Sequence, residues 1–85
     1  MTAPPDVSTT GIHRSVAEIV RVVTERESID PAADLFDQGV TSLAFIRIVA
    51  QLNAMHDITL DVSVLEDASV DELSALVVRS VGRHH

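Results

Sequence analysis

The chain has 85 residues, with 13 Asp and Glu against 6 basic residues, all of them Arg, and a formal net charge of −7. A chain of this length forms one small domain with little room for a deep catalytic cleft. The acidic balance argues against nucleic-acid binding, which depends on clustered Lys and Arg. The absence of cysteine excludes disulfides, thiolate nucleophiles and cysteine-based metal sites.

The sequence has no apolar stretch near the roughly 18 residues that a membrane span needs, and its N-terminus lacks the apolar core of a signal peptide. We therefore expect a cytoplasmic, monomeric protein that does not bind membranes. Met1 suggests a free-standing chain, although an excised domain would look the same. The polar, Pro-rich start predicts a flexible tail over residues 1–11. A second tail is expected at residues 83–85.

A first helix is predicted over residues 12–26, because apolar side chains recur there at helical spacing. These side chains are Ile12, Val16, Ile19 and Val23. The long loop that follows, residues 27–41, contains a residue before proline that disfavours helix, Asp30, and a turn residue, Gly39. Its apolar side chains are expected to fold onto the core: Ile29, Leu35 and Phe36.

Residues 42–55 predict a second helix with Thr41 or Ser42 as its N-cap. On a helical projection this segment has two apolar sides. The side expected in the core comprises Phe45, Ile48, Val49 and Leu52. The opposite side comprises Leu43, Ala50 and Ala54, with Ile46 at its border and Arg47 within it. So small a chain has few helices to cover both sides. We therefore expect a patch that docks partner proteins, with burial of both sides as the alternative. That patch comprises Leu43, Ile46, Arg47 and Ala50.

The C-terminal part predicts a short helix and a last long one. Asp61 is placed to cap a short helix over residues 62–65. Ser69 and Glu72 form a capping box that opens the last helix, and Gly82 ends it. Its expected inward residues are Val70, Leu73, Leu76 or Val77, and Val81. The elements together predict an all-α bundle.

Ser42 taken alone is most simply explained as a helix cap. A serine hydrolase is disfavoured, because the sequence from Gly39 to Leu43 lacks the Gly-x-Ser-x-Gly pattern and no histidine stands in an evident relation to Ser42. No catalytic residue is therefore expected. The histidines show no ligand spacing, so we expect no metal site.

The sequence that precedes Ser42 changes this interpretation. Residues 34–43, Asp-Leu-Phe-Asp-Gln-Gly-Val-Thr-Ser-Leu, resemble the phosphopantetheine attachment motif of acyl and peptidyl carrier proteins. In that family an Asp-x-Gly-x-x-Ser-Leu core follows a buried aromatic residue and opens the second helix. The matching residues here are Phe36, Asp37, Gly39, Ser42 and Leu43. The similarity in element order extends over residues 12–81. It implies a four-helix acyl-carrier-like bundle, with three main helices and a short one, as a carrier domain of residues 12–82.

The resemblance also implies a function. Ser42 would bear 4′-phosphopantetheine, transferred from coenzyme A by a phosphopantetheinyl transferase, and the arm would hold acyl or aminoacyl groups as thioesters. The positive end of the helix would suit the phosphodiester. The carrier would catalyse nothing itself, and its partners would be an acyl- or aminoacyl-loading enzyme and a downstream synthase or transferase. Asp37 and Thr41 join the docking patch as expected partner contacts.

Two departures from the family pattern refine the expectation. The residue before the serine is often Asp in the family, and here it is Thr41. Carriers of fatty acid synthesis usually have an acidic second helix, whereas residues 43–55 contain Arg47 and no Asp or Glu. This favours a discrete carrier in polyketide or nonribosomal peptide assembly. Acidic contacts would then come from flanking residues: Asp34, Asp37, Glu66, Asp67, Asp71 and Glu72. The alternative is a non-catalytic helical interaction module without a prosthetic group.

Overall fold

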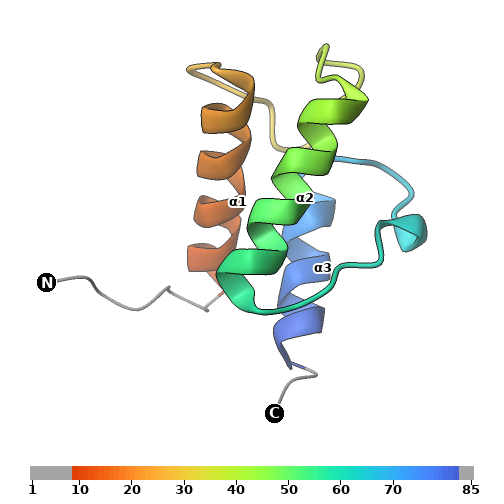
Figure 1. Cartoon of the computed structure of the whole chain (residues 1–85). Helices are drawn as coiled ribbons and strands as arrows, with labels where there is room; N and C mark the ends of the chain where they lie inside the picture. Colours follow the sequence, from red (N-terminus) through yellow and green to blue (C-terminus); the bar gives the residue numbers. More distant parts are fainter. Residues whose placement is uncertain (1–8, 83–85) are drawn as a thin grey trace, which may run out of the picture.

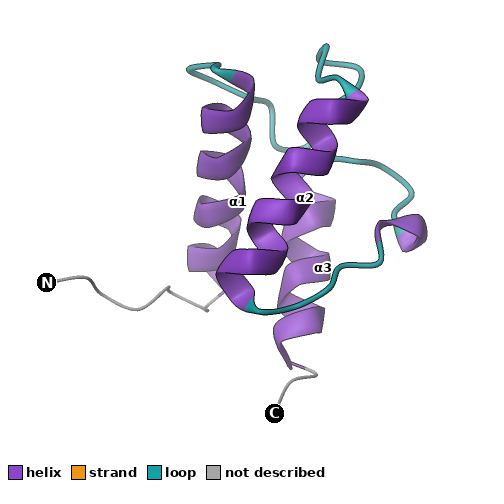
Figure 2. Cartoon of the chain, viewed as in Figure 1, coloured by secondary structure: helices purple, strands orange, loops and turns teal. Residues whose placement is uncertain are grey.

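The structure is a computed structural model that describes residues 9–82. Within this range the chain is helical and contains no strand (Figures 1 and 2). The helices are α1 (Thr9–Thr24), α2 (Ser42–His56), the short 3₁₀ helix η1 (Val62–Val64) and α3 (Val70–Gly82). The all-α class is therefore confirmed. The parts of the predicted tails at residues 1–8 and 83–85 lie outside the described residues.

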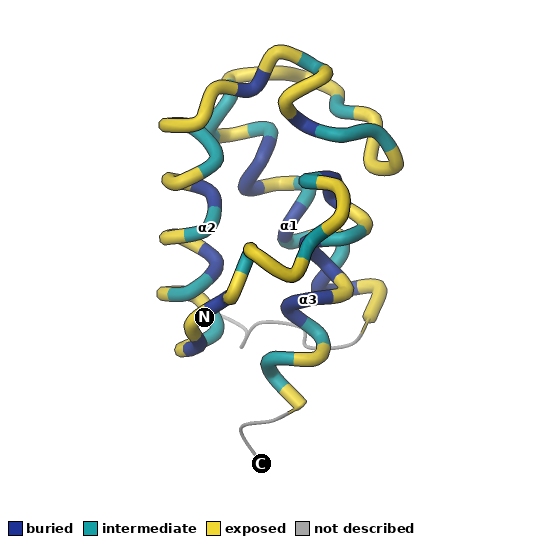
Figure 3. The backbone as a smooth tube through the Cα atoms, turned by 90° about the vertical axis from the view of Figure 1, so that its right-hand side faces the viewer, coloured by how far each residue is buried: buried dark blue, intermediate teal, exposed yellow. Residues whose placement is uncertain are grey.

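Helix α1 is central to the packing, because it contacts both α2 and α3. In Figure 1, α1 runs upward while α2 and α3 run downward. The buried sides of the three helices face one another, as the dark segments of Figure 3 show. The helical residues of this core are Ile12, Val16, Ile19, Val20, Ile48, Leu52, Val70, Leu73, Leu76 and Val77. Burial of such aliphatic side chains is the main stabilising term of a small bundle.

The first helix is displaced from its predicted range of 12–26. It begins at Thr9 and ends at Thr24, so residues 9–11 are helical rather than part of the predicted tail. The C-terminal end is set by Glu25, which adopts a left-handed conformation with φ 56°. This allows the backbone N–H of Arg26 to donate to the carbonyl of Arg21 at 3.0 Å, a bond that closes the helix end.

The short helix predicted over residues 62–65 is present, but as a 3₁₀ helix, and the described residues hold three α-helices. The segment forms only the three-residue η1, which Asp61 caps as predicted by accepting from the backbone N–H of Ser63 at 3.1 Å. Leu65 then returns to extended backbone. So short a segment closes few backbone hydrogen bonds against the cost of nucleation, and its two valines are β-branched.

The loop between α1 and α2 packs onto the core, although not with every residue expected. Leu35 is fully buried and Ile29 packs against the core. Phe36 does not behave as predicted, because 45% of it remains exposed. Its ring lies against Phe45, with the ring centroids 5.2 Å apart. Phe36 therefore covers the outer edge of the core, where an aromatic pair still gains from contact.

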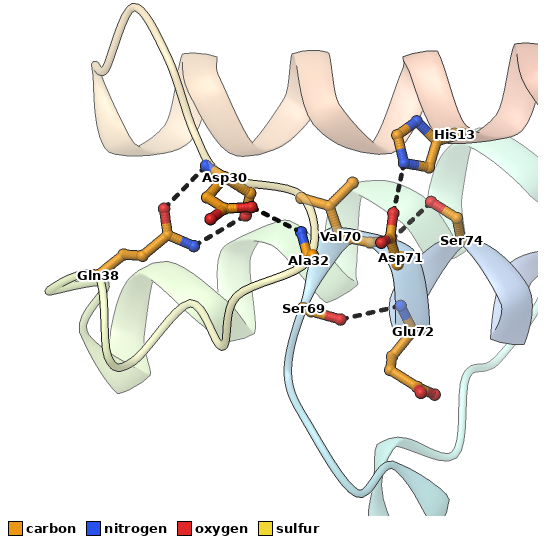
Figure 4. A network of polar contacts seen from close by, with 9 residues as sticks. All are labelled: His13, Asp30, Ala32, Gln38, Ser69, Val70, Asp71, Glu72 and Ser74. Carbon is orange, nitrogen blue, oxygen red and sulfur yellow. Dashed lines mark hydrogen bonds and ion pairs between the residues drawn. The ribbon is translucent and has the colours of Figure 1, made fainter.

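Polar contacts join the start of α3 to the rest of the fold (Figure 4). His13 Nε2 of α1 lies 2.7 Å from Asp71 Oδ1 of α3. The Ser69 hydroxyl accepts from the backbone N–H of Glu72 at 3.1 Å, so Ser69 caps α3 as predicted. The backbone N–H of Asp71 donates to the carbonyl of Pro31 at 3.0 Å. These contacts fix the long loop against the helix that closes the bundle.

Candidate functional site

The loop that leads into α2 is organised around the carboxylate of Asp34. Its Oδ1 accepts from the backbone N–H of Phe36 at 2.8 Å and of Asp37 at 3.3 Å, and its Oδ2 accepts from that of Ala68 at 3.0 Å. The hydrogen bond from Ala68 is the largest cause that holds the pKa of the Asp34 carboxyl below its usual value; desolvation opposes it, and the weaker effects of the Phe36 and Asp37 hydrogen bonds add to the lowering. Asp34 thus serves the fold, and is not a free acidic contact as the sequence suggested.

Gln38 holds the other side of the same loop. Its side-chain oxygen accepts from the backbone N–H of Asp30 at 3.0 Å, and its amide nitrogen donates to the carbonyls of Asp30 at 3.0 Å and Ala33 at 3.1 Å. Figure 4 shows the reciprocal pair that Gln38 makes with Asp30. Next to it, Gly39 adopts φ 89°, a conformation that side chains with a Cβ rarely adopt. The loop therefore approaches α2 along a fixed path.

Thr41, and not Ser42, caps α2. Thr41 has extended backbone, and its hydroxyl accepts from the backbone N–H of Ala44 at 3.1 Å. Ser42 is then the first residue of the helix. This resolves the two alternatives that the sequence left open, and it leaves the Ser42 hydroxyl unused by the helix.

The Ser42 side chain is exposed at the positive end of α2. Within residues 9–82, its hydroxyl makes no hydrogen bond, and the backbone N–H groups of Ser42 and Leu43 have no acceptor. Helix α2 also contains no carboxylate. An anion attached to this oxygen would meet unpaired donors and no repelling charge within the helix.

The outer side of α2 is exposed, whereas its inner side packs on the core. Leu43 and Ile46 expose 59% and 62% of their surface, and Arg47 and Ala50 are exposed as well. Figure 3 shows exposed residues recurring along this outer side. Burial of both sides, the alternative considered from the sequence, is thus excluded. On the inner side Ile48 and Leu52 are fully buried, while Phe45 and Val49 are partly buried.

Outside the start of α2, the polar groups of residues 9–82 include a partly buried histidine. Burial lowers the pKa of His56, whose ring Nε2 has no partner among the described residues. Within residues 9–82, no group of three metal-ligating side chains is close enough to hold an ion. None of the helices in the described range is long and apolar enough to cross a bilayer.

A comparison with known protein families covers both the helices and the loop before Ser42. A family model described as a phosphopantetheine attachment site matches residues 11–77, which include the organised loop, Ser42 and all of α2. The chain belongs to the phosphopantetheine-attachment family. It is therefore a carrier protein, since domains of this family hold a covalently attached 4′-phosphopantetheine and are not catalytic. No curated protein and no solved structure matches this carrier significantly.

The start of α2 suits the prosthetic group of this family. It offers an exposed hydroxyl without a protein partner and two unpaired backbone N–H groups. When bound, the group supplies a thiol that holds the carrier's cargo as a thioester. The other expected partner contacts, Asp37 and Thr41, are both exposed, and Thr41 directly precedes Ser42 in the chain.

The sequence did not predict the contributions of Asp34 and Gln38 to this site. A signal for Asp34 was present, because Asp commonly accepts hydrogen bonds from backbone N–H groups two and three residues later. For Gln38 the partners lie up to eight residues away, and no local pattern predicts them.

Proposed function

We propose that Ser42 bears the phosphopantetheine arm and that this carrier presents acyl or aminoacyl thioesters in polyketide or nonribosomal peptide assembly. The observation that carries the proposal is that two adjacent residues at the start of α2 have separate roles. Thr41 supplies the cap, so the adjacent Ser42 hydroxyl is exposed and has no hydrogen-bond partner in the described range. A hydroxyl in that state is free to react without any loss of helix stability.

Loading at this hydroxyl is a phosphoryl transfer. An ester bond forms between Ser42 Oγ and the phosphorus that bears the pantetheine in coenzyme A, and the pyrophosphate bond breaks. Adenosine 3′,5′-bisphosphate leaves, and the hydroxyl proton passes to a base of the transferase. Because the positive end of α2 stabilises negative charge, the new phosphodiester lies in a favourable field.

The exposed side of α2 is the surface that we propose for enzyme docking. Leu43, Ile46 and Ala50 form its apolar part, and Arg47 lies among them; Asp37 and Thr41 border it from the loop. Leu43 and Ile46 are each more than half exposed in the free protein. Burial of their side chains by a docking enzyme would therefore contribute favourable free energy to binding.

The polarity of α2 supports the choice of pathway. The helix carries Arg47 and no carboxylate, whereas carriers of fatty acid synthesis usually present an acidic second helix. Enzymes that recognise an acidic helix would find no matching charge here. We therefore favour polyketide or nonribosomal peptide assembly.

Intact-mass measurement after incubation with coenzyme A and a promiscuous phosphopantetheinyl transferase tests the attachment site. The wild-type protein and a Ser28→Ala variant, which removes another exposed loop serine, should each gain one phosphopantetheine mass. Ser42→Ala should gain none and retain its helical circular dichroism. A wild-type protein that gains no mass would support the interaction module without a prosthetic group.

The docking surface is tested with the unloaded protein, which is the substrate of the same transferase. Leu43→Ala and Ile46→Ala should raise the KM for the carrier, because each removes apolar contact area. Val22→Ala is the matched control, since Val22 is 61% exposed on α1 and outside the docking surface. Equal effects of all three substitutions would contradict the assignment of this surface.

The cargo is tested on protein purified from its native host. The mass of the loaded arm should correspond to an aminoacyl group or to a polyketide building block or intermediate. A series of saturated fatty acyl masses would contradict the proposed pathway.

A further inference from the structure

A hollow of about 270 Å³ lies between the end of α1 and the start of α2. Its lining includes Thr24, Arg26, Gly39, Thr41, Leu43 and Arg47. Both helix ends lie at the top of Figure 1, beside the loop that leads into α2. Two of its lining residues, Thr41 and Leu43, are the direct neighbours of Ser42 in the chain. The hollow therefore adjoins the proposed attachment site without containing the serine itself.

The hollow is a positive spot on an acidic protein. Two of the six basic residues of the chain, Arg26 and Arg47, line it. Arg21 is paired with Glu18, but neither Arg26 nor Arg47 has a carboxylate partner within residues 9–82. The side chain of Arg47 makes no hydrogen bond in that range either. Two arginines thus line one hollow, and neither forms an ion pair within residues 9–82.

Arg26 is held in position before any partner arrives. Its backbone N–H donates to the carbonyl of Arg21 at 3.0 Å, and its guanidinium donates to the carbonyl of Gln38. A Cβ at position 39 would lie 2.9 Å from Arg26 Nη2, so the glycine at this position makes room for the guanidinium. A side chain fixed in this way loses less conformational entropy when it binds.

The position of the hollow indicates which of the enzymes that act on a carrier would contact it. Enzymes that act on the cargo reach the thiol at the far end of the arm. The loading transferase, in contrast, forms its bond at Ser42 Oγ and must bring its own surface against the residues on either side. Contact with Thr41 and Leu43 necessarily covers the rim of the hollow. The loading transferase is thus the partner most constrained to face Arg26 and Arg47.

We propose that the hollow receives a carboxylate side chain of the loading transferase, which pairs with Arg26 and Arg47. This inference rests on the proposed function of Ser42. Guanidinium groups bind carboxylates through paired, charge-assisted hydrogen bonds, and Arg is enriched at the centres of interfaces. The chain as a whole has a net charge of −7, so a positive spot beside the serine favours one orientation of the enzyme.

Steady-state loading of the full chain by the phosphopantetheinyl transferase of the same host, with coenzyme A, tests the proposal. Arg47→Ala should raise the KM for the carrier about three- to tenfold, with kcat and the KM for coenzyme A unchanged. Arg26→Ala should act in the same direction, and Arg47→Glu should act more strongly. Arg14→Ala is the matched control, because it removes an equal charge from an exposed position of α1 outside the hollow.

Each outcome has a separate meaning. An unchanged KM for Arg47→Ala, or an equal rise for Arg14→Ala, would overturn the proposed carboxylate contact. A rise in the KM for coenzyme A instead would show that the arginines bind the phosphates of the donor, which also overturns it. Failure of the wild-type protein to load would contradict Ser42 as the attachment site. If Arg26→Ala disturbs the loop, the KM for the carrier measured with Arg47→Ala alone still tests the proposed carboxylate contact.

Discussion

The side chain of Asp34 accepts a hydrogen bond of 3.0 Å from the backbone N–H of Ala68, which lies 34 residues further along the chain. The neighbouring backbone N–H of Leu35 donates to the carbonyl of Ala68 at 2.9 Å. The loop before Ser42 and the segment before α3 are therefore joined at one point. The position of the proposed attachment serine depends on this joint as well as on the packing of α2.

Asp34 should make the fold sensitive to acid. Its pKa is lowered in the folded state, chiefly by the hydrogen bond from Ala68. The unfolded chain therefore binds a proton more readily than the folded one, and stability rises with pH across the interval between the two pKa values. The contribution is complete above the usual value of 3.8 and is lost as the pH falls through the folded-state pKa.

Urea unfolding at neutral and acidic pH checks this prediction with a matched pair of variants. Asp34→Asn should lower stability at neutral pH and reduce the loss of stability on acidification. Asp37→Asn should do neither, because the exposed Asp37 carboxylate makes no hydrogen bond within residues 9–82. Equal behaviour of the two variants would contradict the structural role of Asp34.

Thr41 should contribute more to stability than its neighbour Ser42. Thr41→Ala removes the acceptor for the backbone N–H of Ala44 and should lower the free energy of unfolding by about 1 kcal/mol. Thr41→Ser keeps the hydroxyl and should cost much less. Ser42→Ala should change stability little. A larger cost for Ser42→Ala than for Thr41→Ala, measured by urea denaturation, would mean that Ser42 is the cap.

Gly39 should resist substitution for two separable reasons. Gly39→Ala places a side chain at φ 89° and brings a Cβ to 2.9 Å from Arg26 Nη2, so we expect a loss of roughly 1–2 kcal/mol. In an Arg26→Ala background the steric part disappears, and the cost should fall by about 0.5 kcal/mol. Chemical denaturation of the four proteins gives the coupling energy. If Gly39→Ala lowers the free energy of unfolding equally in both backgrounds, the Arg26 side chain does not clash with a Cβ at position 39.

Phe45 should matter less than its size suggests. A fully enclosed Phe loses about 3–5 kcal/mol on truncation to Ala, but Phe45 is only partly buried and its ring rests against the half-exposed Phe36. We expect Phe45→Ala to cost about 2 kcal/mol, and Leu52→Ala, at a fully buried position, about 3 kcal/mol or more. Thermal unfolding that ranks Phe45→Ala above Leu52→Ala would contradict this order.

The sequence predicted those parts of the fold that depend on local patterns. The periodic spacing of Ile12, Val16 and Ile19 placed the first helix. The side-chain oxygens of Asp61 and Ser69 marked the starts of η1 and α3. The division of α2 into a buried and an exposed side also followed from its sequence, because the number of helices available to cover it was small.

The rest depended on contacts between distant residues. The exposure of Phe36 follows from where Phe45 and Leu35 lie in the folded chain, and the loop sequence alone does not contain that information. The choice of Thr41 over Ser42 as the cap depends on the direction from which the loop enters α2. That direction is set in part by the hydrogen bond between Asp34 and Ala68. A single sequence carries no pattern for a contact of this kind.

Peptide mapping of the loaded protein tests the central claim most directly. Trypsin cleaves after Arg26 and Arg47, and the peptide between them, residues 27–47, contains three hydroxyl side chains: Ser28, Thr41 and Ser42. Fragmentation of this peptide should place one phosphopantetheine on Ser42 and leave Thr41 unmodified. A modification on Thr41 or Ser28, or an unmodified peptide from a protein that has gained the mass elsewhere, would contradict the account.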